Sequence, residues 1–102
     1  MLRRLVETNM DETLGYGADP YCQSATERIR EACGCPDARV YFLTGGTQVN
    51  ATVMYAVLRH CQGVISPVTG HINHHESGAV EATGHKVIAL PGHDGGKLNA
   101  KE

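Results

Sequence analysis

Short apolar runs alternate with longer helical runs along this chain. The apolar runs are Val40–Leu43, Gly63–Ser66 and Lys86–Leu90, and turn-forming residues bound each of them. Runs of this length are typical of β-strands, and the unbroken run Val40–Leu43 is typical of a strand covered on both faces of a parallel sheet. Strands that alternate with helices indicate an α/β fold. We therefore predict a mainly parallel sheet with alternating helices.

Two longer runs have the periodicity of amphipathic helices. The first follows Asp19 and Pro20, a good helix start, and ends before Gly34, a typical stop signal. The second, Val49–His60, places its valines and Ala56 on one side. Shorter helical segments are predicted at Leu2–Glu7, Val80–Thr83 and Leu98–Glu102.

Size and charge restrict the functional classes. The chain has 102 residues, which suits one domain, and a formal net charge of −2, which gives no basic surface for nucleic acid or anionic membranes. No apolar run is long enough to span a bilayer, and no apolar signal segment follows Met1. We expect a cytoplasmic protein that binds neither nucleic acid nor membranes.

The four cysteines allow two readings. They are Cys22, Cys33, Cys35 and Cys61. Without an export signal, we expect free thiols rather than disulfides. A zinc site that uses Cys33 and Cys35 is the alternative, although zinc-binding pairs usually leave a gap of two to four residues.

The segment Thr44–Asn50 links a predicted strand to a predicted helix through paired glycines. Glycines let the backbone approach a ligand, and the free N–H groups of a helix start attract anions such as phosphate. Thr47 adds a hydroxyl donor. The alternative is an ordinary strand-to-helix turn that binds nothing. The segment is not a P-loop, because no Gly-Lys-Ser/Thr follows.

Histidines concentrate in the segment Thr69–Ala79, which follows the second predicted strand. His71 and His75 are four residues apart and would share a helix face, but Glu76 does not stand where a zinc-protease motif requires it. We therefore predict no metal site. A second interpretation is that the ring of His71 lies against a planar cofactor at the strand ends, where open α/β sheets bind ligands. The alternative for these histidines is a surface or hydrogen-bonded role.

In combination, these residues resemble the threonine aldolase and aromatic-amino-acid β-eliminating lyase family. The resemblance rests on Gly15–Gly17, Thr44–Asn50, Gly70–Ile72 and His75–Ala79, in this order and spacing, and covers the chain from about Leu2 to Lys97. It implies pyridoxal phosphate as the cofactor and the fold of type I pyridoxal-phosphate enzymes. It also implies a homo-oligomeric lyase of amino acid metabolism that cleaves β-hydroxy-α-amino acids to glycine and an aldehyde.

The resemblance assigns roles to individual residues. It implies that Gly45, Gly46 and Thr47 hold the cofactor phosphate, and that His71 stacks on the cofactor ring and handles the hydroxyl proton of the substrate. It implies that Glu76 orients the catalytic surroundings and that Tyr16 lines the site at a subunit contact. Gln48 and Asn50 are interpreted as support for the turn and the helix.

In complete members of the family, the Schiff-base lysine and the residues that hold the pyridine nitrogen and the substrate carboxylate lie downstream of Glu102. We therefore expect residues 1–102 to be an incomplete large domain, a fragment without a second domain, and inactive alone. The alternatives are a non-catalytic, self-associating α/β product of a shortened gene and a small zinc module that uses cysteines and histidines.

Overall fold

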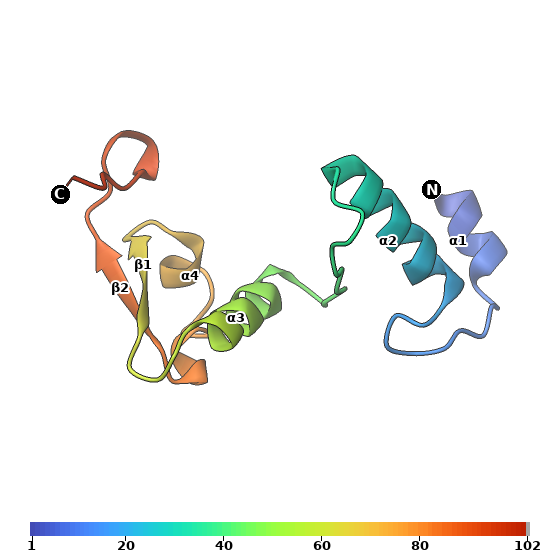
Figure 1. Cartoon of the computed structure of the whole chain (residues 1–102), viewed down its shortest axis with the longest axis horizontal. Helices are drawn as coiled ribbons and strands as arrows, with labels where there is room; N and C mark the ends of the chain where they lie inside the picture. The colour runs from blue at the N-terminus through green and yellow to red at the C-terminus, as the bar shows by residue number, and fades with distance from the viewer. Residues whose placement is uncertain (102) are drawn as a thin grey trace. The chain divides into compact units, whose positions relative to one another are not determined.

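The computed structural model describes residues 1–101, the side chain of Asp94 excepted, and the chain divides into two units (Figure 1). The first unit spans Met1–Phe42, and the second begins at Leu43. Each unit is described by itself. The prediction that residues 1–102 form one partial domain stays a prediction.

The first unit contains helices α1 (Leu2–Thr8) and α2 (Pro20–Cys33). The carboxylate of Asp19 caps α2 by accepting a hydrogen bond from the Cys22 N–H at 2.9 Å, and Pro20 takes the first helical position. Gly34 ends the helix with φ of 63°, in the left-handed region that favours glycine. The predicted start and stop of α2 are both confirmed.

The second unit is a small α/β structure. Its elements are α3 (Gly46–Val57), β1 (Gly63–Pro67), α4 (His71–His74), η1 (Glu81–Thr83), β2 (Lys86–Leu90) and η2 (Asp94–Gly96), where η marks a 3₁₀ helix. The two strands pair in parallel, with Gly63 opposite Lys86 and Pro67 opposite Leu90. The connection from β1 to β2 carries α4 and η1, so the predicted parallel pairing of these two strands is confirmed.

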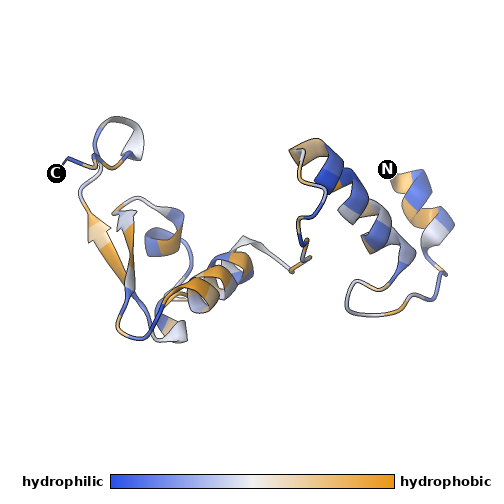
Figure 2. Cartoon of the chain, viewed as in Figure 1, coloured by the Kyte–Doolittle hydropathy of each residue, from blue (hydrophilic) through white to orange (hydrophobic). Residues whose placement is uncertain are grey.

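The core of the second unit is small. Among the residues that the structure describes, the buried apolar side chains are Val80, before η1, at 0% exposure and Val87, on β2, at 6%. Figure 2 shows α3 as a mostly apolar helix, whereas α2 is mostly hydrophilic. Yet Val53 and Val57 of α3 are 46% and 65% exposed. Much of the apolar surface of α3 is therefore open to solvent or to further protein.

Two predicted elements are wrong. Val40–Leu43 is not a strand, and Tyr41 is 74% exposed. A strand needs a neighbour to satisfy its backbone N–H and C=O groups, and β1 and β2, the strands found in residues 1–101, pair with each other. The predicted helix at the C-terminal end also does not form over residues 98–101, where irregular chain and a turn replace it, and Glu102 lies outside the described residues.

None of the helices from α1 to η2 is both long and apolar enough to cross a membrane. The four cysteines are free thiols, and three of them are exposed.

Candidate functional site

A buried carboxylate joins two helices of the second unit. Glu76 Oε1 accepts a hydrogen bond from Asn50 Nδ2 in α3 at 2.5 Å, and it lies 2.7 Å from Nδ1 of His71 in α4. Asn50 and Glu76 are 26 residues apart in the sequence, so only folding brings them together. We call these three residues the Asn–Glu–His cluster.

The surroundings of Glu76 keep its carboxyl group ionised. The side chain is fully buried, and burial by itself raises the pKa of Glu76. The hydrogen bonds from Asn50 and His71, together with the charge of His71, outweigh burial and hold this pKa below its ordinary value of 4.5. At neutral pH, Glu76 therefore carries a negative charge. Its second oxygen, Oε2, is buried without a hydrogen-bond partner among residues 1–101.

This ionised carboxylate sets the tautomer of His71. A carboxylate only accepts hydrogen bonds, so Nδ1 of His71 carries the proton that faces Glu76. In the neutral imidazole, Nε2 is then the unprotonated nitrogen and can accept a proton. The His71 side chain is 63% exposed. The arrangement thus combines a fixed inner edge of the ring with an outer edge that a ligand can reach.

Close packing at Gly70 positions the start of α4 and therefore His71. The backbone of Gly70 has φ of −64°, which any residue adopts. A Cβ at this position would overlap the Ser66 hydroxyl and lie 3.0 Å from the Pro67 carbonyl oxygen. Glycine is therefore required for steric reasons, because a larger residue would push α4 away from the end of β1.

The paired glycines begin α3. Gly45 is the N-cap and Gly46 the first helical residue, so the helix starts three residues before the predicted Val49. Gln48 Oε1 accepts hydrogen bonds from the Thr44 N–H at 2.9 Å and from the Thr44 hydroxyl at 2.7 Å. These bonds confirm that Gln48 supports the turn.

The first turn of α3 leaves its donors open. The first N–H groups of a helix have no partner within it, and Gly45, Gly46 and Thr47 are exposed. A Cβ built on either glycine meets nothing within 4 Å. Space for a ligand therefore adjoins these N–H groups and the Thr47 hydroxyl.

The helix start and the cluster lie on one side of α3. Gly46 and Asn50 are four residues apart in a continuous helix, and such residues share a face. Asn50 contacts Glu76, which holds His71. The predicted phosphate donors and the predicted ring-stacking histidine therefore belong to the same face of the unit.

This donor set fits pyridoxal phosphate. Backbone N–H groups at a helix start and a hydroxyl suit a phosphate, and the exposed imidazole of His71 suits a planar heterocycle. The lysines of the chain stand outside this set and are Lys86, Lys97 and Lys101. The residues present thus fit the phosphate and one ring face of the cofactor.

Tyr16 belongs to the first unit. It lies between Gly15 and Gly17, has φ of 61° and is fully exposed. Its side chain does not pack back on the chain. Its role as a cofactor contact stays a prediction.

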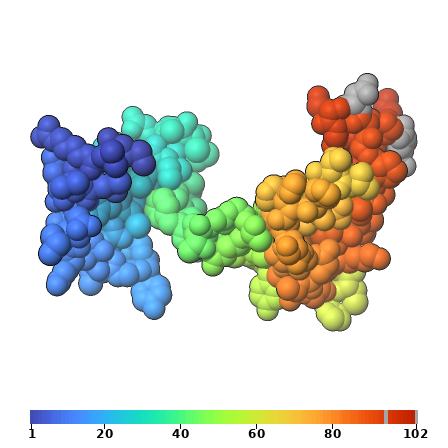
Figure 3. All heavy atoms as spheres, turned by 180° about the vertical axis from the view of Figure 1, so that it is seen from behind, coloured from blue at the N-terminus to red at the C-terminus, as the bar shows by residue number. Residues whose placement is uncertain are grey.

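The other histidines of the segment contact His71. The ring of His75 lies 5.4 Å from that of His71 between centroids and 4.8 Å from that of His74. Figure 3 shows this segment, in gold, against the orange spheres of β2. Within residues 1–101, no three His, Cys, Asp or Glu side chains come together as a metal site.

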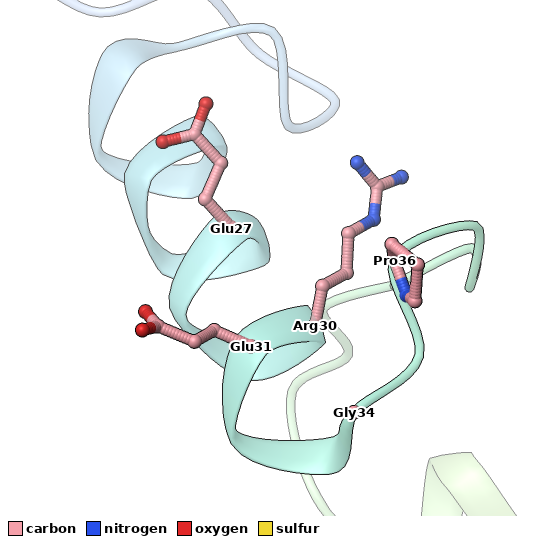
Figure 4. A pocket seen from close by; sticks show the side chains of 5 residues that line it. All are labelled: Glu27, Arg30, Glu31, Gly34 and Pro36. Atoms are coloured by element: carbon pink, nitrogen blue, oxygen red, sulfur yellow. The ribbon is translucent and has the colours of Figure 1, made fainter.

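A separate hollow of about 450 Å³ lies at the end of α2, in the first unit (Figure 4). Glu27 and Glu31 point away from Arg30, whose Nε donates to the Ala38 carbonyl oxygen at 2.8 Å. The remaining lining residues are Gly34 and Pro36. The hollow contains none of the predicted site residues.

Sequence reasoning missed the role of Asn50. It interpreted this residue as support for the helix, whereas the side chain reaches Glu76. Two signals could have found it: asparagine is a weak helix former inside an otherwise apolar run, and it stands one helical turn after Gly46.

The chain is similar to known proteins over nearly all of its length. The model of the Beta-eliminating lyase family matches residues 1–102. The solved structure of threonine aldolase from Leishmania major is 44% identical and has a TM-score of 0.88, over 95% of this chain. The chain spans 28% of the length of that protein. A search of curated proteins found no significant match.

Proposed function

This chain belongs to the beta-eliminating lyase family, and from that premise we propose that it supplies part of the active site of a threonine-aldolase-like lyase. The reaction is the cleavage of β-hydroxy-α-amino acids such as threonine to glycine and an aldehyde, with pyridoxal phosphate as the cofactor. Residues 1–102 are the N-terminal portion of the large domain and do not turn over substrate alone.

One observation carries this proposal. The open N–H groups of α3 and the imidazole of His71 stand on the same face of the second unit, linked through Asn50 and Glu76. A helix start with open N–H groups suits the phosphate of a planar cofactor, and a histidine with a fixed tautomer suits a proton transfer beside it.

Each residue of the site has a chemical task. Pyridoxal phosphate, when bound, supplies the electron sink for breaking the Cα–Cβ bond. The N–H groups of Gly46 and Thr47, with the Thr47 hydroxyl, donate hydrogen bonds to a phosphate. His71 Nε2 accepts the hydroxyl proton of the substrate, and the ionised Glu76 stabilises the positive charge that His71 then carries.

The first experiment tests the cofactor assignment without turnover. Pyridoxamine phosphate is the probe, because it has the phosphate and the ring but no aldehyde that could react with the lysines. We expect residues 1–102 to bind it weakly in equilibrium dialysis, and pyridoxamine without the phosphate to bind at least about tenfold more weakly. Equal binding of the two ligands would contradict the phosphate assignment.

A matched pair of variants locates the binding. Thr47→Val removes the hydroxyl at nearly constant size and is expected to weaken pyridoxamine phosphate by about tenfold. Thr52→Val removes a hydroxyl from the same helix beyond its first turn and serves as the control.

Release of glycine from threonine by residues 1–102 alone would contradict the proposal that these residues do not turn over substrate alone.

We also propose a homo-oligomer and a cytoplasmic location. The free thiols of the four cysteines are typical of a reducing compartment. Exposed apolar side chains on both strands of the second unit, Ile65 at 57% and Ile88 at 43%, support contacts with further protein.

The same exposure favours a second candidate, a non-catalytic α/β chain that persists by self-association. Its buried apolar core is restricted to Val80 and Val87 among the described residues. Light scattering tests this candidate, because it requires oligomers of the chain even without any cofactor. A monomer at high concentration would eliminate it.

A further inference from the structure

We propose that Asn50 is a positioning residue that holds Glu76 from α3 and, through Glu76, fixes the orientation and tautomer of His71. The hydrogen bonds that support this role are formed between residues of the chain. The catalytic part of this inference rests on the proposed function, whereas the structural part concerns only the Asn–Glu–His cluster.

The hydrogen bonds concentrate on one carboxylate oxygen. Asn50 Nδ2 and His71 Nδ1 both reach Glu76 Oε1, at 2.5 and 2.7 Å. Because Oε2 has no partner within residues 1–101, these two donors determine where the carboxylate points. If the Asn50 donor is lost, the contact to an exposed histidine is the one of these two that remains, and it alone holds the carboxylate in its orientation.

An amide suits this role better than a charged side chain. A lysine in place of Asn50 would compete with His71 for the charge of Glu76, and a carboxylate would repel it. The neutral amide donates a hydrogen bond and leaves the negative charge available to His71. Asn50 thereby supports an ionised Glu76 in a buried place, which is the condition for a protonated Nδ1.

Two side chains, one titratable and one neutral, act on the carboxyl group of Glu76. From α4, His71 is the titratable group whose charge acts on Glu76, and from α3 the facing group is the neutral Asn50 amide. Hydrogen bonds from both residues lower the pKa of Glu76 against the opposing effect of burial. Removal of one of them should therefore raise it.

The test uses Asn50→Leu and Asn50→Asp in the polypeptide that carries this sequence, at its natural length. Asn50→Asp nearly keeps the side-chain volume, and Asn50→Leu keeps the branched shape without a polar atom. A space-filling role would tolerate Asn50→Asp, whereas a donor role would tolerate neither variant. The first readout is the ¹³C titration of the Glu76 carboxyl, assigned with Glu76→Gln. The second is the ¹⁵N shift pair of the His71 ring, which reports its tautomer.

We expect Glu76 to titrate at higher pH in both variants than in the wild type, and the Nδ1–H tautomer of His71 to lose its dominance. We expect kcat for threonine cleavage to fall by about tenfold, with KM nearly unchanged, as when a group that orients a catalytic residue is removed. If one variant does not fold, the other decides. Wild-type titration of Glu76 and a wild-type tautomer in a folded variant would overturn the proposal.

Asn73→Leu is the matched control. Asn73 Nδ2 donates to the Val68 carbonyl oxygen at 2.7 Å, so this variant also loses an amide hydrogen bond in the second unit. It should leave the Glu76 titration unchanged, and an equal shift would show general loosening and overturn the proposal. A wild type that does not cleave threonine would refute the proposed function, while the two resonance measurements would still decide the role of Asn50.

Discussion

Asp19 and Glu76 are both buried carboxylates, but their partners differ. Asp19 is 9% exposed and accepts a hydrogen bond from the N–H of Cys22, three residues along the chain. Glu76 is 5% exposed and accepts from Asn50, 26 residues away in α3, while it also contacts an exposed histidine. The carboxylate of Asp19 caps the helix that follows it. The carboxylate of Glu76 connects α3 with the imidazole ring of His71 in α4.

The two carboxyl groups reach a low pKa by different means. Hydrogen bonds from the side chain and the N–H of Cys22 hold the pKa of Asp19 below its ordinary value of 3.8. For Glu76, burial opposes ionisation, and the bonds from Asn50 and His71 have to overcome it. A low pKa alone therefore does not distinguish a structural carboxylate from a functional one, whereas the origin of the donors does.

The largest effect is expected from Glu76→Gln. Loss of the negative charge removes the tautomer control and the charge stabilisation of His71, so kcat for threonine cleavage should fall by about a hundredfold or more in the natural-length polypeptide. Steady-state kinetics measure it. Asp19→Asn is the matched control and should keep kcat, and an equal loss in both variants would end the distinction between the two carboxylates.

Asp19→Ala should affect stability rather than chemistry. Without its cap, the start of α2 loses a hydrogen bond to the Cys22 N–H, and the Tm should fall by about 4 °C. Circular dichroism during heating measures the change. A lower kcat at temperatures well below the Tm would mean that Asp19 has a role outside its helix.

Acid should destabilise the fold through both groups. Because the pKa of each carboxyl is lower in the folded state, each one stabilises the fold above its ordinary value, 3.8 for Asp19 and 4.5 for Glu76. That stabilisation is lost as the pH falls through the folded-state pKa. Melting curves recorded between pH 6 and pH 2 should show a smaller change in Tm with pH for Asp19→Asn and for Glu76→Gln than for the wild type. A variant that follows the wild-type curve would exclude its carboxylate as a source of acid sensitivity.

Gln48→Ala should have the smallest effect and no pH dependence. Gln48 also stabilises a helix start, but as a neutral acceptor for Thr44, which precedes the N-cap, on an exposed surface. We expect a loss of about 0.5–1 kcal/mol in the free energy of unfolding, measured with urea at pH 7 and pH 4. Different losses at the two pH values would show that a charged group contributes to this turn.

The sequence predicts elements whose signals are local. Asp19, Pro20 and Gly34 mark both ends of α2, because capping involves neighbours within one turn. The strands β1 and β2 also appear where the apolar runs predict them. In contrast, the apolar run Val40–Leu43 has the composition of a strand but no described neighbour to pair with, and composition does not reveal pairing.

The candidate site divides in the same way. The paired glycines are recognisable from the sequence because they stand directly before a helix. His71 and Glu76 were predicted through a family resemblance, and their 2.7 Å contact spans only five residues. Asn50 was not recognised as part of the site, since its contact with Glu76 depends on how α3 packs against the connection between β1 and β2. Such a partner becomes visible only in the folded unit.

The crowded space around Gly70 affects how mutational scans of this protein should be read. Any side chain there would collide with Ser66 and Pro67, at the point where the chain enters the helix of His71. In a library of single substitutions ranked by fitness, position 70 should therefore appear as intolerant as a residue that takes part in the reaction, although glycine contributes no reactive group. Intolerance at this position measures the room available to the backbone and not participation in chemistry.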